Sequence, residues 1–153
     1  ETVDRLNPNS IIYNYSTDAK TAEIIEIIRQ YDVVIDCTDN FKTRFKVADA
    51  CQKYMKPYIL GAVRAYEGQI TTILPSTSKI KNPKIRDLFD EENISNTGDD
   101  CSDIGVLSVT TTLVGTIMAS ECLKLILNID EVLVGKLLMV DLLNLKFETI
   151  KYK

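Results

Sequence analysis

Residues 31–44 (YDVVIDCTDNFKTR) have the types and spacing in this sequence best suited to chemistry. The β-branched run at residues 33–35 is typical of a strand buried on both faces, and it stops at the polar group Asp36, Cys37, Thr38, Asp39 and Asn40. A helical pattern follows at once, so Asp39 and Asn40 are predicted to lie where a strand ends and a helix begins. In open α/β sheets, the carboxyl end of a strand is where ligands bind.

Two interpretations of this segment are open. The carboxylate of Asp39 can hold a hard cation, and Mg²⁺ usually arrives carrying phosphates. Alternatively, Asp39 or Asn40 only caps the helix that follows, because Asp and Asn lead the N-cap preferences. Arg44 can face bound phosphates, or it can pair on the surface with Asp39 or Asp49, a contact worth less than ~1 kcal/mol. For Arg44 we favour a structural role.

The composition bounds the class of protein. A chain of 153 residues suits one domain with its own core. The net charge of −4, without a cluster of Lys or Arg, argues against nucleic-acid binding. The absence of histidine excludes Ser-His-Asp and Cys-His catalysis and any His-ligated metal within this chain. Four widely spaced cysteines, two of them in predicted core elements, favour a reduced, cytoplasmic protein over a disulfide framework: Cys37, Cys51, Cys101 and Cys122.

Strand and helix patterns alternate in the first half of the chain. Strands are predicted at residues 11–16, 32–37, 57–62 and 69–74, and helices at residues 21–30 and 41–55. This alternation predicts an α/β fold, Rossmann-like, with a parallel-centred sheet flanked by helices.

The second half is predicted to hold a long loop, a long helix and two last strands. Residues 75–104 have few apolar positions, apart from a short helix expected at 85–91, and loops of this length are often functional or mobile. A long apolar helix is predicted at 105–127, followed by strands at 137–141 and 145–152 that can run antiparallel. The apolar stretch 106–122 is too short and too polar for a membrane span, so no membrane partner is expected.

Four blocks of the sequence resemble the ThiF/MoeB/HesA family, the bacterial relatives of ubiquitin-activating enzymes. Asp36 to Asn40 and Arg44 match its D-C-T-D-N-x-x-x-R motif. Residues 56–75, 101–127 and 135–153 resemble, in order and spacing, its K-P to E-G-Q segment, its C-x-x-x-G-V helix and its closing strands. The resemblance implies that residues 1–153 are a single domain, the C-terminal part of an adenylation domain, in which residues 75–104 form a crossover loop over the active site.

The resemblance also implies a reaction. Members of this family attack the α-phosphate of ATP with the C-terminal carboxylate of a ubiquitin-like sulfur-carrier protein, in thiamine, molybdopterin or related sulfur transfer. Asp39 and Asn40 are then expected to contact ATP and its Mg²⁺, with Arg44 as a further candidate contact. A homodimer is expected as well, with the apolar helix at 105–127 and its small residues Gly115 and Ala119 contributing to it.

Cys101 is a second candidate, because some ThiF-like proteins use a cysteine at this point as a thiol that joins the activated carrier. Its neighbours Asp99, Asp100 and Asp103 disfavour the thiolate. The alternative is a loop cysteine with no covalent role.

The sequence departs from the family in two respects. No glycine-rich phosphate loop (G-x-G-x-x-G) occurs, so we expect these residues to be the C-terminal part of a longer protein and to be inactive alone. The alternative is a non-catalytic binding or dimerisation module derived from the family; a nicotinamide-dependent dehydrogenase has no positive support.

The second departure concerns zinc. Where many members have the first of two zinc-binding C-x-x-C pairs, this chain has Lys84-Ile85-Arg86-Asp87, and Cys37 and Cys51 are assigned to the core. We therefore expect no zinc site. Without that anchor, the loop at 75–104 is expected to be the most mobile segment and to act as a lid.

Overall fold

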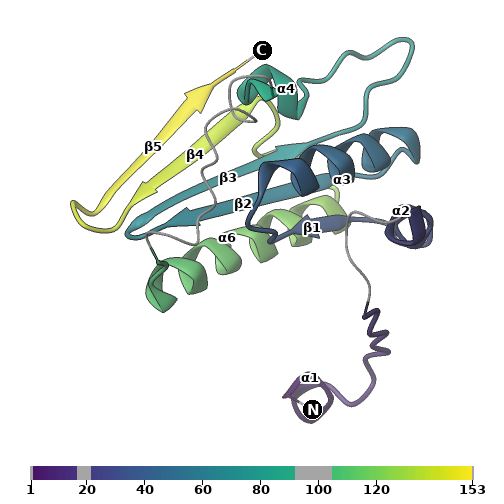
Figure 1. The fold of residues 1–153 in the computed structure, drawn as a ribbon, viewed down its shortest axis with the longest axis horizontal. Helices are drawn as coiled ribbons and strands as arrows, with labels where there is room; N and C mark the ends of the chain where they lie inside the picture. The colour runs from purple at the N-terminus through teal and green to yellow at the C-terminus, as the bar shows by residue number, and fades with distance from the viewer. Residues whose placement is uncertain (1, 17–21, 92–104, 153) are drawn as a thin grey trace.

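A computed structural model describes residues 2–16, 22–91 and 105–152 and shows a mixed sheet with helices on both faces (Figure 1). The helices are α1 (Thr2–Leu6), α2 (Ala22–Ile28), α3 (Phe41–Lys53), α4 (Ile85–Leu88) and α6 (Ser108–Ile126). The strands are β1 (Val34–Asp36), β2 (Tyr58–Arg64), β3 (Glu67–Ile73), β4 (Lys136–Asp141) and β5 (Lys146–Lys151). They form one five-stranded sheet in the order β1-β2-β3-β4-β5.

The α/β prediction is confirmed, but the predicted parallel centre was wrong, because the parallel pair β1 and β2 lies at one edge of the sheet and the central pairs are antiparallel. The crossover through α3 makes β1 and β2 parallel, with Val34 opposite Tyr58. The last two strands are antiparallel, as the sequence allowed. Antiparallel pairing already begins at β2 and β3, because only Ala65 and Tyr66 separate Arg64 from its partner Glu67. Such a short connection cannot return a chain to a parallel position.

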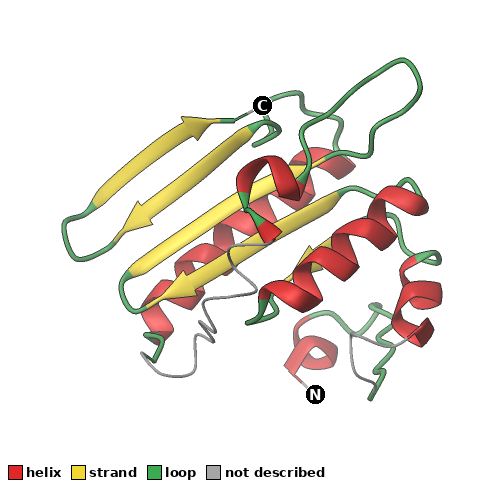
Figure 2. Ribbon diagram, turned by 45° about the horizontal axis from the view of Figure 1, so that its top comes forward, coloured by secondary structure: helices red, strands yellow, loops and turns green. Residues whose placement is uncertain are grey.

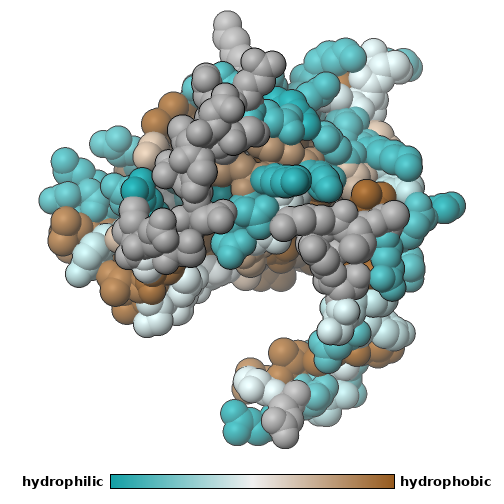
Figure 3. Space-filling view, in the orientation of Figure 1, coloured by the Kyte–Doolittle hydropathy of each residue, from teal (hydrophilic) through white to brown (hydrophobic). Residues whose placement is uncertain are grey.

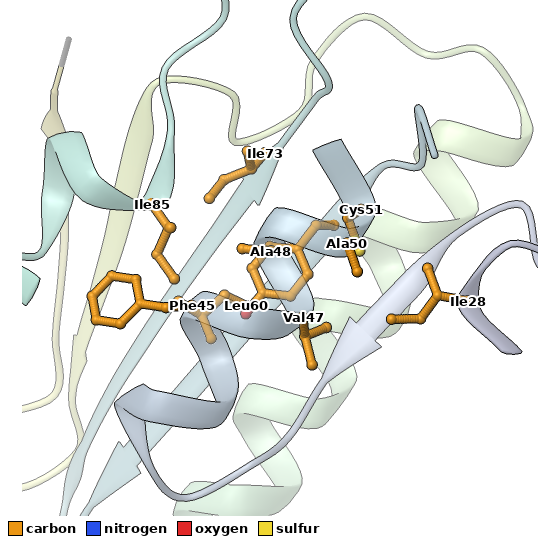
Figure 4. Packing of buried hydrophobic residues seen from close by; sticks show 10 residues of the cluster. Ile28, Phe45, Val47, Ala48, Ala50, Cys51, Leu60, Ile73 and Ile85 are labelled. Atoms are coloured by element: carbon orange, nitrogen blue, oxygen red, sulfur yellow. The ribbon is translucent and has the colours of Figure 1, made fainter. Parts of the chain in front are cut away.

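Two core clusters lie on opposite faces of the sheet. Successive side chains of a strand point to opposite faces, so Leu60 packs in the cluster under α3 and Ile59 in the cluster under α6. Figure 2 shows α3 and α6 on the two faces. In Figure 4, Phe45 of α3 and Ile85 of α4 lie in the first cluster, so α4 belongs to the same layer as α3.

Two glycines of the sheet let α6 approach closely. A Cβ on Gly61 would lie 2.1 Å from Sδ of Met118, and one on Gly68 would lie 2.5 Å from Cγ2 of Val114. By contrast, Gly115 of α6 has no neighbour within 4 Å of such an atom. The pair Gly115 and Ala119 therefore faces outward, and the close contact uses small residues of the sheet instead.

Within the described residues, α6 is the one helix that is long and apolar enough, by length and composition, to cross a membrane. The sequence-based judgement that this stretch is too short was wrong, because the apolar run continues beyond Cys122 through Leu123, Leu125 and Ile126. In the structure, Val114 and Met118 of this helix pack against the sheet.

The strand predicted at residues 11–16 is absent. This segment is extended, and its large apolar side chains are exposed, Ile11 by 80% and Tyr13 by 66%. None of the described strands lies beside it, and β1 pairs only with β2. Residue type alone suggested a strand, but a strand also needs a neighbour for its backbone hydrogen bonds.

A buried carboxylate joins α6 to the sheet. Glu121 is 1% exposed and accepts hydrogen bonds of 2.7 Å from the hydroxyl of Thr72 on β3 and from the backbone N–H of Leu133. It also forms an ion pair with Lys124. A buried charge is stable only when paired, and here three groups compensate it.

Candidate functional site

The candidate site is the turn of residues 37–40, between the last residue of β1 and the first residue of α3. The prediction that Asp39 and Asn40 lie where a strand ends and a helix begins is therefore confirmed. The turn is at the carboxyl end of the parallel strand pair, where open α/β sheets place their ligands.

Asn40 is the N-cap of α3. Its backbone is extended (φ −133°, ψ 141°), and its Oδ1 accepts a hydrogen bond of 2.9 Å from the N–H of Thr43. The capping interpretation thus holds for Asn40 and not for Asp39. The amide of Asn40 also donates a 3.1 Å hydrogen bond to Oδ1 of Asp39. The cap therefore holds the exposed carboxylate of Asp39 at the start of the helix.

Arg44 is buried and holds the turn from behind. It is 3% exposed, and its Nε and Nη2 donate to the carbonyl oxygen of Thr38 at 3.1 and 2.5 Å. The alternative that Arg44 forms a surface ion pair with Asp39 or Asp49 was wrong for two reasons. The side chain points inward from α3, and Asp49 pairs instead with Arg86 at 2.6 Å. The contacts agree with the structural role favoured from sequence.

Asp36 holds the turn from the strand side. It is 3% exposed, and its carboxylate accepts from the hydroxyl of Tyr58 at 2.6 Å and from the N–H of Thr38 at 2.8 Å. Burial, together with the charge of Asp36, raises the pKa of Tyr58, so this hydroxyl stays protonated. The role of Tyr58 was not predicted; the available signal was Asp36 at the end of one strand, with a tyrosine beginning the next parallel strand.

A cavity of about 150 Å³ opens beside the turn. Its walls are mostly apolar and join elements far apart in sequence. Small-molecule sites usually measure about 300–1,000 Å³, so the described residues enclose room for part of a nucleotide or for a peptide end. The hydroxyl of Thr38 is buried and has no hydrogen-bond partner among the described residues. The lining residues are Cys37, Thr38, Asp39, Arg44, Gly61, Val63, Val106, Thr111, Val114, Gly115 and Met118.

Cys37 lies on this cavity wall and is exposed, so its assignment to the core was wrong. The reason is that β1 ends one residue earlier, at Asp36. Partial burial of the sulfur, and then the charge of Asp36, raise the pKa of Cys37 above its ordinary value, although Arg44 opposes this. Cys51 is buried, and burial raises its pKa to about 12. Cys101 lies outside the described residues.

The residues present fit a magnesium ion that arrives with a nucleotide. Mg²⁺ is commonly held by one or two carboxylates together with substrate phosphates and waters. Asp39 can supply one such carboxylate, and no group of three or more potential metal-binding side chains occurs in the described part of the chain. Where the family has its first zinc-binding pair, the carboxylate of Asp87 accepts from the N–H of Lys84 at 2.7 Å and begins α4. The absence of zinc stays a prediction.

The first part of the crossover loop is packed against α3. Ile85 is 2% exposed, and the rings of Phe89 and Phe41 lie 4.9 Å apart. The helix expected at 85–91 is present, although shorter, as α4. Mobility was expected across this loop, but residues 85–89 gain enough apolar burial to dock on α3. Residues 92–104, the rest of the predicted lid, lie outside the described residues.

Comparison with known proteins identifies the family of the chain. The chain matches the ThiF family over residues 1–153, and it belongs to that family. It is 37% identical over 147 residues to a probable molybdopterin-synthase adenylyltransferase of Porphyra purpurea, covering 95% of this chain and 37% of the relative. It is 36% identical over 148 residues to the SAMP-activating enzyme E1 of Haloferax volcanii, covering 97% and 53%.

The fold is also that of solved structures. The crystal structure of E. coli MccB with ATP aligns with a TM-score of 0.75 at 12% identity, over 97% of this chain and 45% of MccB. At that identity the likeness shows the fold alone. The chain spans about half or less of the length of these proteins.

Proposed function

We propose that this chain is part of an enzyme that adenylates the C-terminal carboxylate of a ubiquitin-like sulfur-carrier protein, with ATP as the second substrate, and that residues 1–153 alone are inactive. The observation that carries the proposal is the exposed carboxylate of Asp39, held beside a cavity at the carboxyl end of β1. The names of the relatives, molybdopterin-synthase adenylyltransferase and SAMP-activating enzyme, agree with this class of reaction.

The proposed reaction needs no proton transfer. A carboxylate oxygen of the carrier forms a bond to the α-phosphorus of ATP, and the bond from that phosphorus to the bridging oxygen of the β-phosphate breaks. Pyrophosphate leaves with the electron pair, and the carrier becomes an acyl-adenylate. Such a step depends on alignment and on neutralising charge, and a bound Mg²⁺ supplies that neutralisation. This agrees with a site that holds a carboxylate and no histidine.

We assign the residues of the turn separate roles. Asp39 would hold the magnesium ion, and Asn40 would orient Asp39 while capping α3. Arg44 fixes the backbone of Thr38, and because it also lines the cavity, its charge would attract a phosphate. A covalent role for Cys101 stays a prediction.

A homodimer is part of the proposal. The buried residues of α6 are Thr110, Val114, Met118 and Glu121, whereas Val109, Leu123 and Ile126 are each more than half exposed. Figure 3 shows apolar side chains gathered over the start of α6 and the turn between β4 and β5. Exposed apolar side chains concentrated on one helix mark an interaction site more often than isolated ones do.

The decisive experiment is pyrophosphate–ATP exchange by the product of the complete gene, in the presence of its carrier protein. Asp39→Ala is expected to abolish exchange because the metal loses a ligand. Asp130→Ala, at an exposed aspartate remote from the cavity, is the matched control and should exchange normally. Normal exchange by Asp39→Ala would mean that Asp39 does not hold the metal and only lies beside the helix cap. A folded wild-type protein without any exchange would favour the non-catalytic module.

A further inference from the structure

An aromatic side chain of the crossover loop reaches the candidate site through α3. The ring of Phe89, just after α4, contacts the ring of Phe41 at 4.9 Å with a tilt of 59°. Phe41 is the first residue of α3, directly after Asn40. Tilted aromatic pairs at this distance are favourable beyond the area that they bury. A loop some fifty residues away in sequence is therefore in contact with the beginning of the helix.

The contact continues from Phe41 to Arg44. The guanidinium carbon of Arg44 lies 5.1 Å from the centre of the Phe41 ring, within the range of a cation–π interaction. Arg44 is 3% exposed, and no carboxylate within 4.0 Å pairs with it in the described residues. A buried cation without an ion pair depends on its remaining partners. Here those are the ring of Phe41 and the carbonyl oxygen of Thr38.

Arg44 in turn sets the backbone that presents Asp39. Its two hydrogen bonds to Thr38 converge on one oxygen, so the side chain fixes the peptide that joins Thr38 to Asp39. A rotation of the guanidinium plane would release that peptide. The position of Asp39 therefore depends on how Phe41 holds Arg44, and the position of Phe41 depends on Phe89.

The docking of α4 makes this arrangement specific. Arg86 donates to both carboxylate oxygens of Asp49 at 2.6 and 3.0 Å, and it lies 5.1 Å from the ring centre of Phe45. These contacts of Arg86, together with the buried side chain of Ile85, attach α4 to α3. The docked helix α4 therefore holds Phe89 in contact with Phe41.

We infer that Phe89 and Phe41 are positioning residues for the adenylation site, acting on Asp39 through Arg44 and the carbonyl of Thr38. The inference rests on the proposed function for its effect on catalysis. Its structural part, the dependence of Arg44 on Phe89, stands on the contacts alone. The first half of the crossover loop therefore helps to support the site.

The experiment measures both parts in the product of the complete gene. The Nε–H signal of Arg44 is followed in protein labelled with ¹⁵N-arginine, and Arg44→Lys assigns it by its loss. Phe89→Ala should speed hydrogen exchange of this N–H by about two- to tenfold, the range that corresponds to an aromatic pair. It should also lower kcat/KM for pyrophosphate–ATP exchange by about the same factor. Phe89→Tyr keeps the ring and should restore both values.

Phe147→Ala is the matched control, because Phe147 is a half-exposed phenylalanine of β5, remote from α3. It should change neither readout. Phe41→Leu keeps apolar volume but removes the ring over Arg44, and it should behave like Phe89→Ala. Unchanged Arg44 exchange in Phe89→Ala would overturn the inference, as would an equal effect of Phe147→Ala. If the wild-type enzyme shows no exchange, the proposed function fails, whereas the Arg44 signal still decides the positioning claim.

Discussion

The hydroxyl of Tyr58 donates a 2.6 Å hydrogen bond to the buried carboxylate of Asp36, so the first residue of β2 stabilises the last residue of β1. The same carboxylate accepts from the N–H of Thr38 and so begins the turn that carries Asp39. Strand pairing and the shape of the candidate site therefore share one buried charge.

Tyr58→Phe should lower the free energy of unfolding by ~2 kcal/mol, because a hydrogen bond to a charged acceptor is lost. Tyr66→Phe, at an exposed position, should lower it by less than ~0.5 kcal/mol. Urea denaturation at pH 7 measures both. Equal stability of Tyr58→Phe and wild type would mean that another group compensates Asp36.

The same pair predicts a dependence on alkaline pH. The pKa of Tyr58 is raised in the folded state, so its contribution is fully present below the unfolded pKa of about 10 and is lost as the pH rises above it. Wild type should thus lose stability more steeply above about pH 10 than Tyr58→Phe does. Parallel stability curves for the two proteins between pH 9 and 11 would contradict this.

Two substitutions of Asn40 separate its role as the N-cap of α3 from its role in positioning Asp39. Asn40→Ala should cost ~1 kcal/mol of stability because the N-cap is lost. Asn40→Asp keeps an oxygen for the N–H of Thr43 but removes the amide that donates to Asp39 and adds a like charge beside it. It should keep near-normal stability yet weaken ATP-dependent exchange. If Asn40→Asp exchanges normally, Asn40 serves as a cap only.

The elements around this site show what sequence alone can predict. The strand before Asp36 and the helix after Asn40 were predictable, because both depend on local pattern. Burial of that strand on both faces was wrong, because β1 lies at the edge of the sheet and Ile35 is 44% exposed. The partners of Asp36 and Arg44 were not, because Tyr58 and the carbonyl of Thr38 reach them only once β1, β2 and α3 are packed. The strand expected at 11–16 failed for a similar reason, since pairing depends on a neighbour that residue type does not reveal.

Glu121 supports the opposite face of the sheet and gives a test of stability. Glu121→Leu should destabilise the protein by ~3–5 kcal/mol, because it leaves Lys124 without its buried partner and the Thr72 hydroxyl and Leu133 N–H without an acceptor. Glu131→Leu is a control at an exposed glutamate and should cost less than ~0.5 kcal/mol. Thermal denaturation distinguishes the two. Similar midpoints would show that the network contributes little.

The apolar outer face of α6 predicts the oligomeric state. Leu123→Glu should convert a dimer to a monomer, because Leu123 is 57% exposed on that face and a charge there opposes burial. Ile80→Glu changes a residue of similar exposure, 59%, outside α6, and should leave the dimer intact. Size-exclusion chromatography with light scattering measures the mass. A wild-type monomer at high concentration would refute the dimer.

Cys37 reports on the cavity, because it shares the wall with Asp39. Its pKa is raised, so less thiolate is present at pH 7 than for an ordinary thiol, and alkylation by iodoacetamide should be slow and should accelerate about tenfold per pH unit up to the pKa. ATP with Mg²⁺ should protect Cys37 in the wild type and not in Asp39→Ala. Cys51, buried and with a pKa of about 12, should stay unmodified throughout and serves as the internal control. Peptide mapping by mass spectrometry separates the two cysteines.

Equal protection of Cys37 in the Asp39→Ala protein would place the nucleotide away from Asp39, and an unprotected wild type would place it outside this cavity.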